Sequence, residues 1–260
     1  SATSLFFMVG RLWVREKIQS KADFYRLALC GLFGAALNQL LFFKGLSLTV
    51  EINASVLMIT SPVFVFIIAA VLRSEKITFL KILGLVISFA GALMLITGGK
   101  ALSFSSDTWM GDLMIMLNAS AYGIYLVIVK PLMKKYHPMT IVKWVFIFGA
   151  VVIIPVGMPD LLAVQWEDLT WESIAGVSYI VLFTTIAAYS LNAFALKQVS
   201  ASSVGIYIYL QPVLVAILSV FWAKDVLTEE KLLYMLVVFT GVFLVTYRKK
   251  TLQTTSDKRG

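Results

Sequence analysis

The sequence predicts an all-α integral membrane protein built from two five-helix repeats of opposite orientation. Three observations support this fold class: the composition, the lengths of the apolar runs and an internal repeat. Hydrophobic residues make up 60% of the chain and charged residues only 14%, and the mean hydropathy is +0.89. A soluble domain carries about a quarter charged residues, so we expect this chain to face lipid rather than water.

Eight apolar runs are each long enough for a membrane-spanning helix, which needs about 20 residues. β-Strands are not expected, because no run alternates polar and apolar residues as a barrel strand does. A further, partial run opens the chain, so about eight and a half spans are predicted. In order, the runs cover residues 1–14 (partial), 26–48, 52–72, 78–98, 109–129, 139–158, 171–196, 203–222 and 231–247.

Polar or helix-breaking segments separate the runs, as expected for loops between spans. These segments include two glycines at 98–99, a His-Pro pair at 137–138, a Met-Pro-Asp sequence at 158–160 and a mostly charged stretch at 73–76. Residues 251–260 are polar and are predicted to form a disordered cytoplasmic tail.

Lys and Arg are unequally distributed over the predicted loops. Cytoplasmic loops of membrane proteins are enriched in these residues, so the more basic side, which includes the C-terminus, is predicted to be cytoplasmic. The net charge of +8 is explained by this bias, and no nucleic-acid partner is expected. Most of the 22 basic residues fall on one side, in segments 11–26, 73–81, 130–143 and 248–259 and at Lys197.

An internal repeat appears when the chain is shifted by 150 residues on itself. The first copy of each matched helix precedes its mate by five spans, and an odd number inverts the orientation. We therefore predict an incomplete first repeat in 1–105, which lacks its first helix, and a five-helix second repeat in 106–250. Inverted repeats are typical of transporters with a midplane binding site. The matches least expected by chance are Pro62 with Pro212, Glu75 with Asp225, Thr78 with Thr228, and Gly91 with Gly241.

Polar side chains inside the spans are the candidate binding residues, because such groups are costly in lipid unless they are satisfied. Several share one helix face, as at positions 118, 122 and 125, and amides and phenols can hold a small polar molecule. The alternative is that they only join helices together. The predicted substrate-binding residues are Asn38, Gln39, Asn118, Tyr122, Tyr189, Asn192, Tyr207 and Gln211.

Two prolines inside spans, Pro62 and Pro212, are candidate hinge or gate residues. Proline cannot donate the usual helix hydrogen bond, so each is expected to bend its helix. A static bend without a hinge role is the alternative. Glu75 and Asp225 follow these helices on opposite sides of the membrane, where helix capping or a loop salt bridge is expected.

Enzyme chemistry and metal binding are not predicted. The chain has one cysteine, Cys30, and one histidine, His137, so a disulfide and a Cys/His metal cluster are excluded within it. No acidic residue lies near the centre of a predicted span, so coupling through a central carboxylate is expected to be weak or absent. No catalytic residue, metal or cofactor is predicted. A channel is also less expected than a carrier, because channels have rings of charged residues or a filter loop and none is recognised in this sequence.

The ordered motifs resemble one family, the EamA-like carriers of the drug/metabolite transporter superfamily. They are the Ser-Pro-Val-Phe of 61–64 followed by Glu75, the Gln-Pro-Val-Leu of 211–214 followed by Asp225, the glycine-bearing 84–91 and 239–241, and 121–126. Compared with the family, the first helix is expected to be missing from the given residues, and aspartate stands at 225 where the family usually carries glutamate. The resemblance implies a multi-pass carrier of the bacterial inner membrane, often an exporter of amino acids or related metabolites.

The predicted function is therefore alternating-access transport that exports a small metabolite such as an amino acid. The alternative is a nucleotide-sugar or other anionic-metabolite transporter of the same superfamily. That alternative would need Lys or Arg facing the cavity, and only Lys44 comes close. The expected partners are the substrate and the lipid bilayer, and a homodimer is left open.

Overall fold

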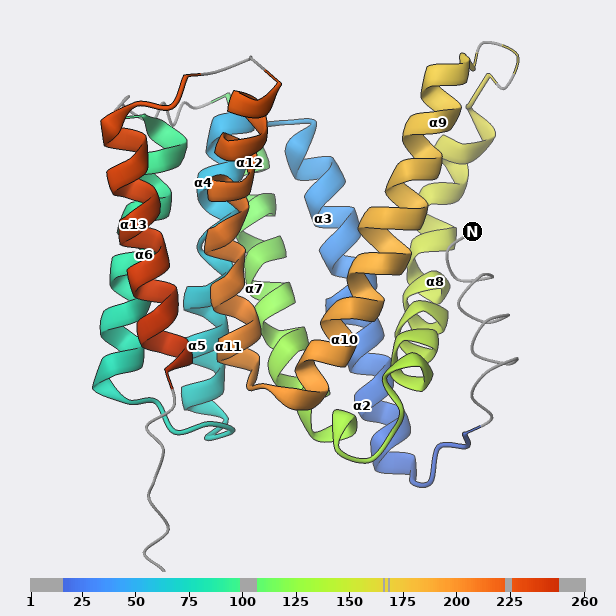
Figure 1. Ribbon diagram of the computed structural model, residues 1–260. Helices are drawn as coiled ribbons and strands as arrows, with labels where there is room; N and C mark the ends of the chain where they lie inside the picture. The colour runs from blue at the N-terminus through green and yellow to red at the C-terminus, as the bar shows by residue number, and fades with distance from the viewer. Residues whose placement is uncertain (1–15, 99–106, 166, 168, 223–225, 248–260) are drawn as a thin grey trace, which may run out of the picture.

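A computed structural model describes residues 16–98, 107–165, 167, 169–222 and 226–247 (Figure 1). All regular structure within these residues is helical. The elements are α2 (Lys21–Gly31), η1 (Leu32–Ala36), α3 (Leu37–Leu46), α4 (Glu51–Met58), α5 (Ser61–Val71), α6 (Phe79–Thr97), α7 (Trp109–Met133), α8 (Pro138–Leu162), α9 (Trp171–Tyr179), η3 (Ile180–Ala187), α10 (Ala188–Gln198), α11 (Ala201–Ile206), η4 (Tyr207–Tyr209), α12 (Leu210–Phe221) and α13 (Glu229–Thr246).

Seven helical segments of the described chain are long and apolar enough to cross a membrane, which confirms seven of the predicted spans. The eighth, α13, has 18 residues, three of them charged and all in its first turn. The partial run 1–14 and the tail 251–260 lie outside the described residues. Three predicted ends are off by four or five residues: the first full span begins at Lys21 instead of 26, α7 continues past 129 to Met133, and α8 continues past 158 to Leu162. In α7 and α8 the helix accommodates internal prolines.

The internal repeat recurs in the helix caps. Ser20 and Thr170 lie 150 residues apart, and each side chain accepts a hydrogen bond from the backbone N–H three residues later, at the start of α2 and α9. Thr78 and Thr228 cap α6 and α13 in the same way. Such N-caps satisfy backbone donors that a helix start leaves unpaired.

Departures from regular helix also recur at this spacing. The segments η1 and η3 are π-helical and occupy matching positions of the two repeats. A turn at 59–60 separates α4 from α5, and the 3-10 segment η4 separates α11 from α12. Pro62 and Pro212 both follow these interruptions, in the first turn of the next helix, where a missing N–H costs least.

A side chain compensates for the proline in the first repeat. In a regular helix the carbonyl of Met58 would accept from the N–H of residue 62, which proline lacks. The Ser61 hydroxyl donates to this carbonyl instead, at 2.8 Å, and Thr60 does the same for Leu57 at 2.6 Å. The helix is thus interrupted without leaving these carbonyls unpaired.

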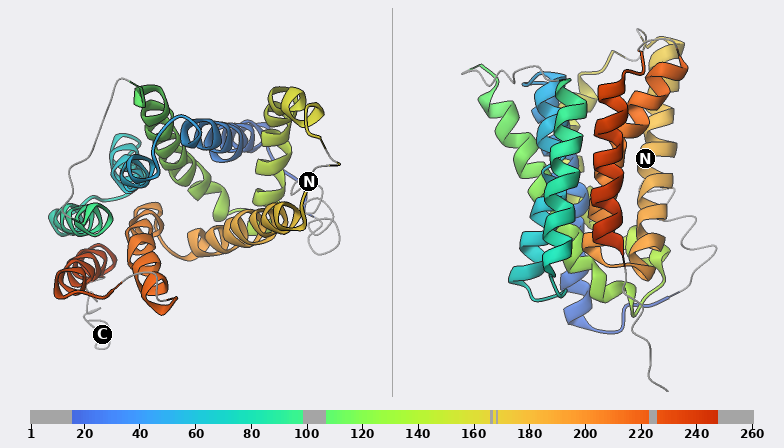
Figure 2. Two further views of the ribbon diagram at one scale, coloured as in Figure 1. Left: turned by 90° about the horizontal axis from the view of Figure 1, so that it is seen from above. Right: turned by 60° about the vertical axis from the view of Figure 1, so that its left-hand side comes forward.

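The two repeats meet where α6 and α13 pack closely and antiparallel, at one edge of the bundle (Figures 1 and 2). The Ser88 hydroxyl donates to the carbonyl of Val238 at 3.5 Å, and these residues are exactly equivalent under the 150-residue shift. Equivalent positions can meet only if the axis relating the repeats passes between them. Glycines at 84 and 241 allow this approach, since small residues let helix backbones come close.

The side of the bundle formed by α8, α9, η3 and α10 is packed tightly at one end only. We call the end where α7 joins α8 and α10 joins α11 the closed end. A buried core there includes Leu132, Met133, Tyr136 and Leu196. At the opposite, open end, α9 and η3 bury none of their residues, and α8 buries none beyond Gly149.

The contact between α6 and α13 predicts the effect of one substitution. A Cβ at Gly241 would lie 2.5 Å from the backbone N of Ser88 and 2.6 Å from the carbonyl O of Gly84. Gly241→Ala should therefore destabilise the protein by about 1–3 kcal/mol, because backbone has to move. Thermal unfolding in detergent measures this.

The matched control is Gly157→Ala on α8, where no heavy atom lies within 4 Å of the added Cβ. This variant should unfold at the wild-type temperature or above, since alanine favours helix. Equal unfolding temperatures for the two variants would contradict the packing argument.

Candidate functional site

A cavity of about 590 Å³, partly open to the outside, lies between the helices of both repeats. Its walls come from α3, α4, α7, α8, η3, α10, η4 and α12. Of the two π-helical segments, η3 lines the cavity, and η1 directly precedes the part of α3 that does. Such segments are frequent at functional sites. Seven of the predicted binding residues line the cavity: Asn38, Gln39, Asn118, Tyr122, Tyr189, Asn192 and Gln211.

Tyr207 is the predicted residue that does not line the cavity. Its side chain is 50% exposed. The prediction assumed a continuous α-helix from Ser203, but the 3-10 segment η4 changes the rotation per residue. As a result Ile208 faces the cavity, and Tyr209 is buried against Phe89 of α6, with ring centroids 6.3 Å apart.

Three helices are joined by hydrogen bonds at Asn38. The side-chain amide of Asn118 on α7 donates to the backbone carbonyl of Asn38. The Tyr189 hydroxyl on α10 donates to the carbonyl of Gly34 in η1 at 2.7 Å and lies 3.3 Å from Oδ1 of Asn38. The Tyr189 ring also packs edge-on against Phe146, at 4.9 Å. Some of the polar residues therefore both join helices and border the cavity.

One wall of the cavity is apolar, and it was not predicted because only polar residues inside the spans were taken as candidates. From α8 the cavity is lined by Phe146, Ala150, Ile153 and Ile154. These residues look like ordinary lipid-facing or core positions in the sequence. Tyr125, Thr184 and Thr185 add polar groups that were also missing from the predicted set.

The cavity lining is electrically neutral. Among the described residues, none that lines it is Asp, Glu, Lys, Arg or His. Lys44 is exposed and is not part of the lining. The part of the chain that the structure describes also contains no group of three His, Cys, Asp or Glu residues that could hold a metal ion. Binding here must therefore depend on hydrogen bonds and apolar contact.

Two buried carboxylates lie near the ends of the helices instead. Asp23, at the closed end, pairs with Lys135 at 3.0 Å and accepts from the Tyr136 hydroxyl at 2.9 Å. Burial raises the pKa of the Tyr136 phenol. Asp112, at the open end, accepts from Thr108 at 3.0 Å, from Thr49, and from Asn53 at 3.4 Å. Both tie helix ends together outside the cavity.

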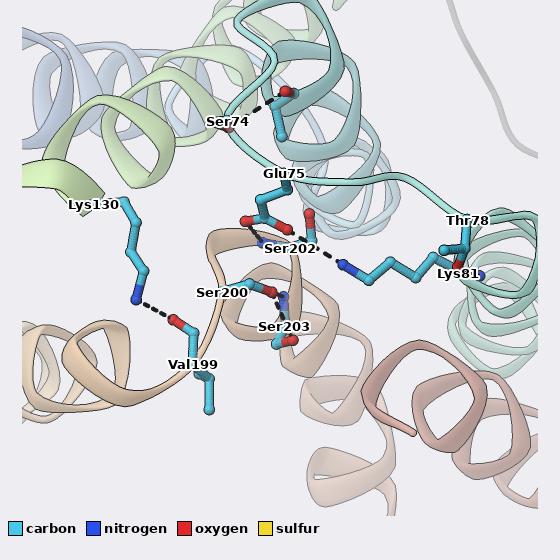
Figure 3. A network of polar contacts seen from close by, with 10 residues as sticks. Ser74, Glu75, Thr78, Lys81, Lys130, Val199, Ser200, Ser202 and Ser203 are labelled. Carbon is cyan, nitrogen blue, oxygen red and sulfur yellow. Dashed lines mark hydrogen bonds and ion pairs between the residues drawn. The ribbon is translucent and has the colours of Figure 1, made fainter. Parts of the chain in front are cut away.

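Polar contacts also hold the corner between α10 and α11 at the closed end (Figure 3). Glu75, in the loop after α5, accepts from the backbone N–H of Ser202 at 3.1 Å and pairs with Lys81 at 3.4 Å. Lys130 of α7 donates to the carbonyls of Leu196 and Val199. Glu75 thus makes both predicted kinds of contact, a cap and a salt bridge, while Asp225 lies outside the described residues.

A multi-pass helical membrane protein with a neutral cavity between two related halves is the arrangement of a small-molecule transporter. The model of the EamA-like transporter family matches residues 1–97 and 109–247, so this chain belongs to that family, within the drug/metabolite transporter superfamily. The protein is accordingly a member of a transporter family and not of an enzyme family.

Relatives of the chain carry transporter names. An "uncharacterized transporter" of Archaeoglobus fulgidus is 26% identical over 95% of this chain and 84% of that protein. The "uncharacterized transporter YyaM" of Bacillus subtilis is 27% identical over 74% and 63%. A "probable terminal-alkyne amino-acid exporter" of Streptantibioticus cattleyicolor is 23% identical over 95% and 81%.

A solved crystal structure shares the fold. It superposes with a TM-score of 0.75 over 94% of this chain and 84% of that chain, at 16% sequence identity. At this identity the likeness concerns the fold alone.

Proposed function

We propose that this protein is an alternating-access carrier that exports a small, net-neutral metabolite such as an amino acid. The observations that carry the proposal are the neutral, partly apolar cavity between the two repeats and the absence of buried residues in α9 and η3, which lead from it toward the open end. A molecule that binds there is reached from one side of the membrane in this state. Exposure to the other side requires the closed end to separate.

The distribution of charge supports an orientation. The closed end carries Arg73, Lys76, Lys134, Lys135 and Lys197. Positively charged loops face the cytoplasm, so we propose that the closed end and the C-terminus are cytoplasmic. The cavity would then be open to the outside of the cell inner membrane, as in an exporter that has released its substrate.

The substrate class is argued from the lining and from one relative. A neutral lining with several amides suits a zwitterion, whose two charges cancel, better than an anion. The similarity to a protein named an amino-acid exporter supports the same class. A nucleotide sugar would bring phosphate charge into a cavity whose described lining offers no Lys or Arg to meet it.

A counterflow screen in proteoliposomes tests this function. Vesicles loaded with neutral amino acids should accumulate the labelled amino acid well above protein-free vesicles, whereas vesicles loaded with UDP-glucose should show no exchange of labelled UDP-glucose. Counterflow of the nucleotide sugar without counterflow of any amino acid would reverse the assignment.

The contacts of Glu75 predict which side of the cavity is accessible. Glu75→Gln replaces the charged acceptor of the Ser202 N–H by a neutral one, which weakens the hydrogen bond that holds α11. It also loses the ion pair with Lys81 of α6. Loss of about 1 kcal/mol should shift the carrier roughly five-fold toward the state open at the closed end.

Side-specific labelling measures this shift. A single cysteine at Ala150 in a Cys30→Ala background reports access to the cavity by an impermeant maleimide. Labelling from the cytoplasmic side should rise in Glu75→Gln but not in the control Glu229→Gln, which changes an exposed carboxylate of α13. Unchanged labelling from both sides would exclude this role for Glu75.

We also propose that the helix interruptions before Pro62 and Pro212 act as hinges. Pro62→Ala restores the N–H that can bond the Met58 carbonyl, so the α4–α5 junction should become a stiffer, more regular helix. Transport should slow several-fold while equilibrium substrate binding stays within about two-fold of wild type. An unaltered transport rate would leave the proline as a static bend.

A further inference from the structure

The side-chain amide of Asn118 uses its nitrogen in a hydrogen bond within the described part of the protein, but not its oxygen. Its side chain is 1% exposed, and it lies on α7 at the cavity wall. Its Nδ2 donates to the backbone carbonyl of Asn38. The opposite orientation would place an oxygen against that oxygen, so this contact determines which amide atom is which. Oδ1 is left without a hydrogen-bond partner within the described part of the chain.

The neighbouring polar groups do not supply the missing donor. The Tyr189 hydroxyl is directed to the Gly34 carbonyl and to Oδ1 of Asn38. The Asn38 backbone carbonyl is itself an acceptor, already used by Asn118. Buried acceptors in native proteins nearly always have a partner, and the exceptions often mark functional positions.

We propose that Oδ1 of Asn118 accepts a hydrogen bond from an N–H group of the substrate and thereby makes Asn118 a specificity-determining residue. The inference rests on the proposed transport function and defines its substrate class further. Oδ1 is shielded from water in this open state, so the hydrogen bond forms as the cavity closes around the substrate. A net-neutral molecule that lacks an N–H group leaves this acceptor unpaired and is rejected.

The rest of the cavity completes the recognition. The side-chain amides of Asn192 and Gln211 line it from the second repeat and make no hydrogen bond to another described residue, so they are available to a carboxylate. The α8 wall, with Ile153 and Ile154, offers apolar contact. An α-amino acid with an aliphatic side chain presents these three groups together: its ammonium to Asn118, its carboxylate to the amides and its side chain to α8.

Two probes that differ only at the nitrogen test the role of Asn118. L-Leucine and N,N,N-trimethyl-L-leucine are both net-neutral zwitterions with the same side chain, and only leucine has N–H donors. In proteoliposomes of the wild-type protein, leucine should compete for counterflow about ten-fold better or more. Asn118→Leu, similar in size but without an acceptor, should reduce this preference to within about two-fold.

Asn192→Leu is the matched control, because it removes another amide of the same cavity. It should weaken competition by both probes equally, so their ratio stays at the wild-type value. A general loss of structure would lower the transport rate in either variant, so the ratio of the two probes, and not the rate, identifies the role of Asn118. Equal competition by the two probes in the wild type overturns the inference without recourse to any variant. So does a wild-type ratio in Asn118→Leu.

The outcomes separate this inference from the proposed function. Leucine counterflow with no preference over the trimethylated probe sustains the transport function and overturns the role of Asn118. Counterflow of a metabolite without an N–H group, and of no amino acid, overturns the N–H zwitterion class. No counterflow of any metabolite overturns the proposed function and this inference with it.

Discussion

Every backbone N–H and carbonyl within a bilayer has to find its hydrogen bond inside the protein, and this constraint governs the structure. Regular helices meet it along most of the chain. The exceptions are η1, η3 and the interruptions before α5 and α12, and each either contains residues of the cavity lining or is followed or preceded by them within two residues in the sequence. At two of these sites side chains bond the freed carbonyls: Ser61 donates to that of Met58 before α5, and Tyr189 donates to that of Gly34 in η1. Some polar side chains in the spans therefore bond backbone carbonyls, and their remaining donors and acceptors are available to the cavity.

The same constraint explains how two opposed halves form one protein. Without a hydrophobic driving force between helices in lipid, close packing has to hold them together. The contact of Ser88 with its own equivalent, Val238, places the repeat axis between α6 and α13, and glycines make that approach sterically possible. At the closed end, packing is supplemented by charge, with Glu75 and Lys130 on either side of the α10–α11 corner. At the open end nothing comparable joins α9 to its neighbours among the described residues.

Particular residues show where sequence reasoning succeeded and where it could not. Polar groups at helical spacing, such as Asn118 and Tyr122, lie on the cavity because a straight helix keeps i and i+4 on one face. Tyr207 fails the same rule, since one 3-10 turn rotates it out. The isoleucines of α8 carry no signal at all, because an apolar side chain facing a cavity reads like one facing lipid. Glu75 was expected to cap or to pair, but its partner Ser202 lies 127 residues away.

Composition and apolar run lengths alone determined that the chain is helical and membrane-embedded and where most spans run, and the 150-residue shift predicted two repeats of opposite orientation. These properties depend on local hydropathy and on residue matches at the 150-residue shift, and both can be read directly from the sequence. Only the tertiary structure decided which end is closed, which face of each helix borders the cavity, and which amide keeps an unpaired oxygen. Those depend on contacts between distant segments and on single irregular turns, because a small change in helical rotation redirects every side chain that follows.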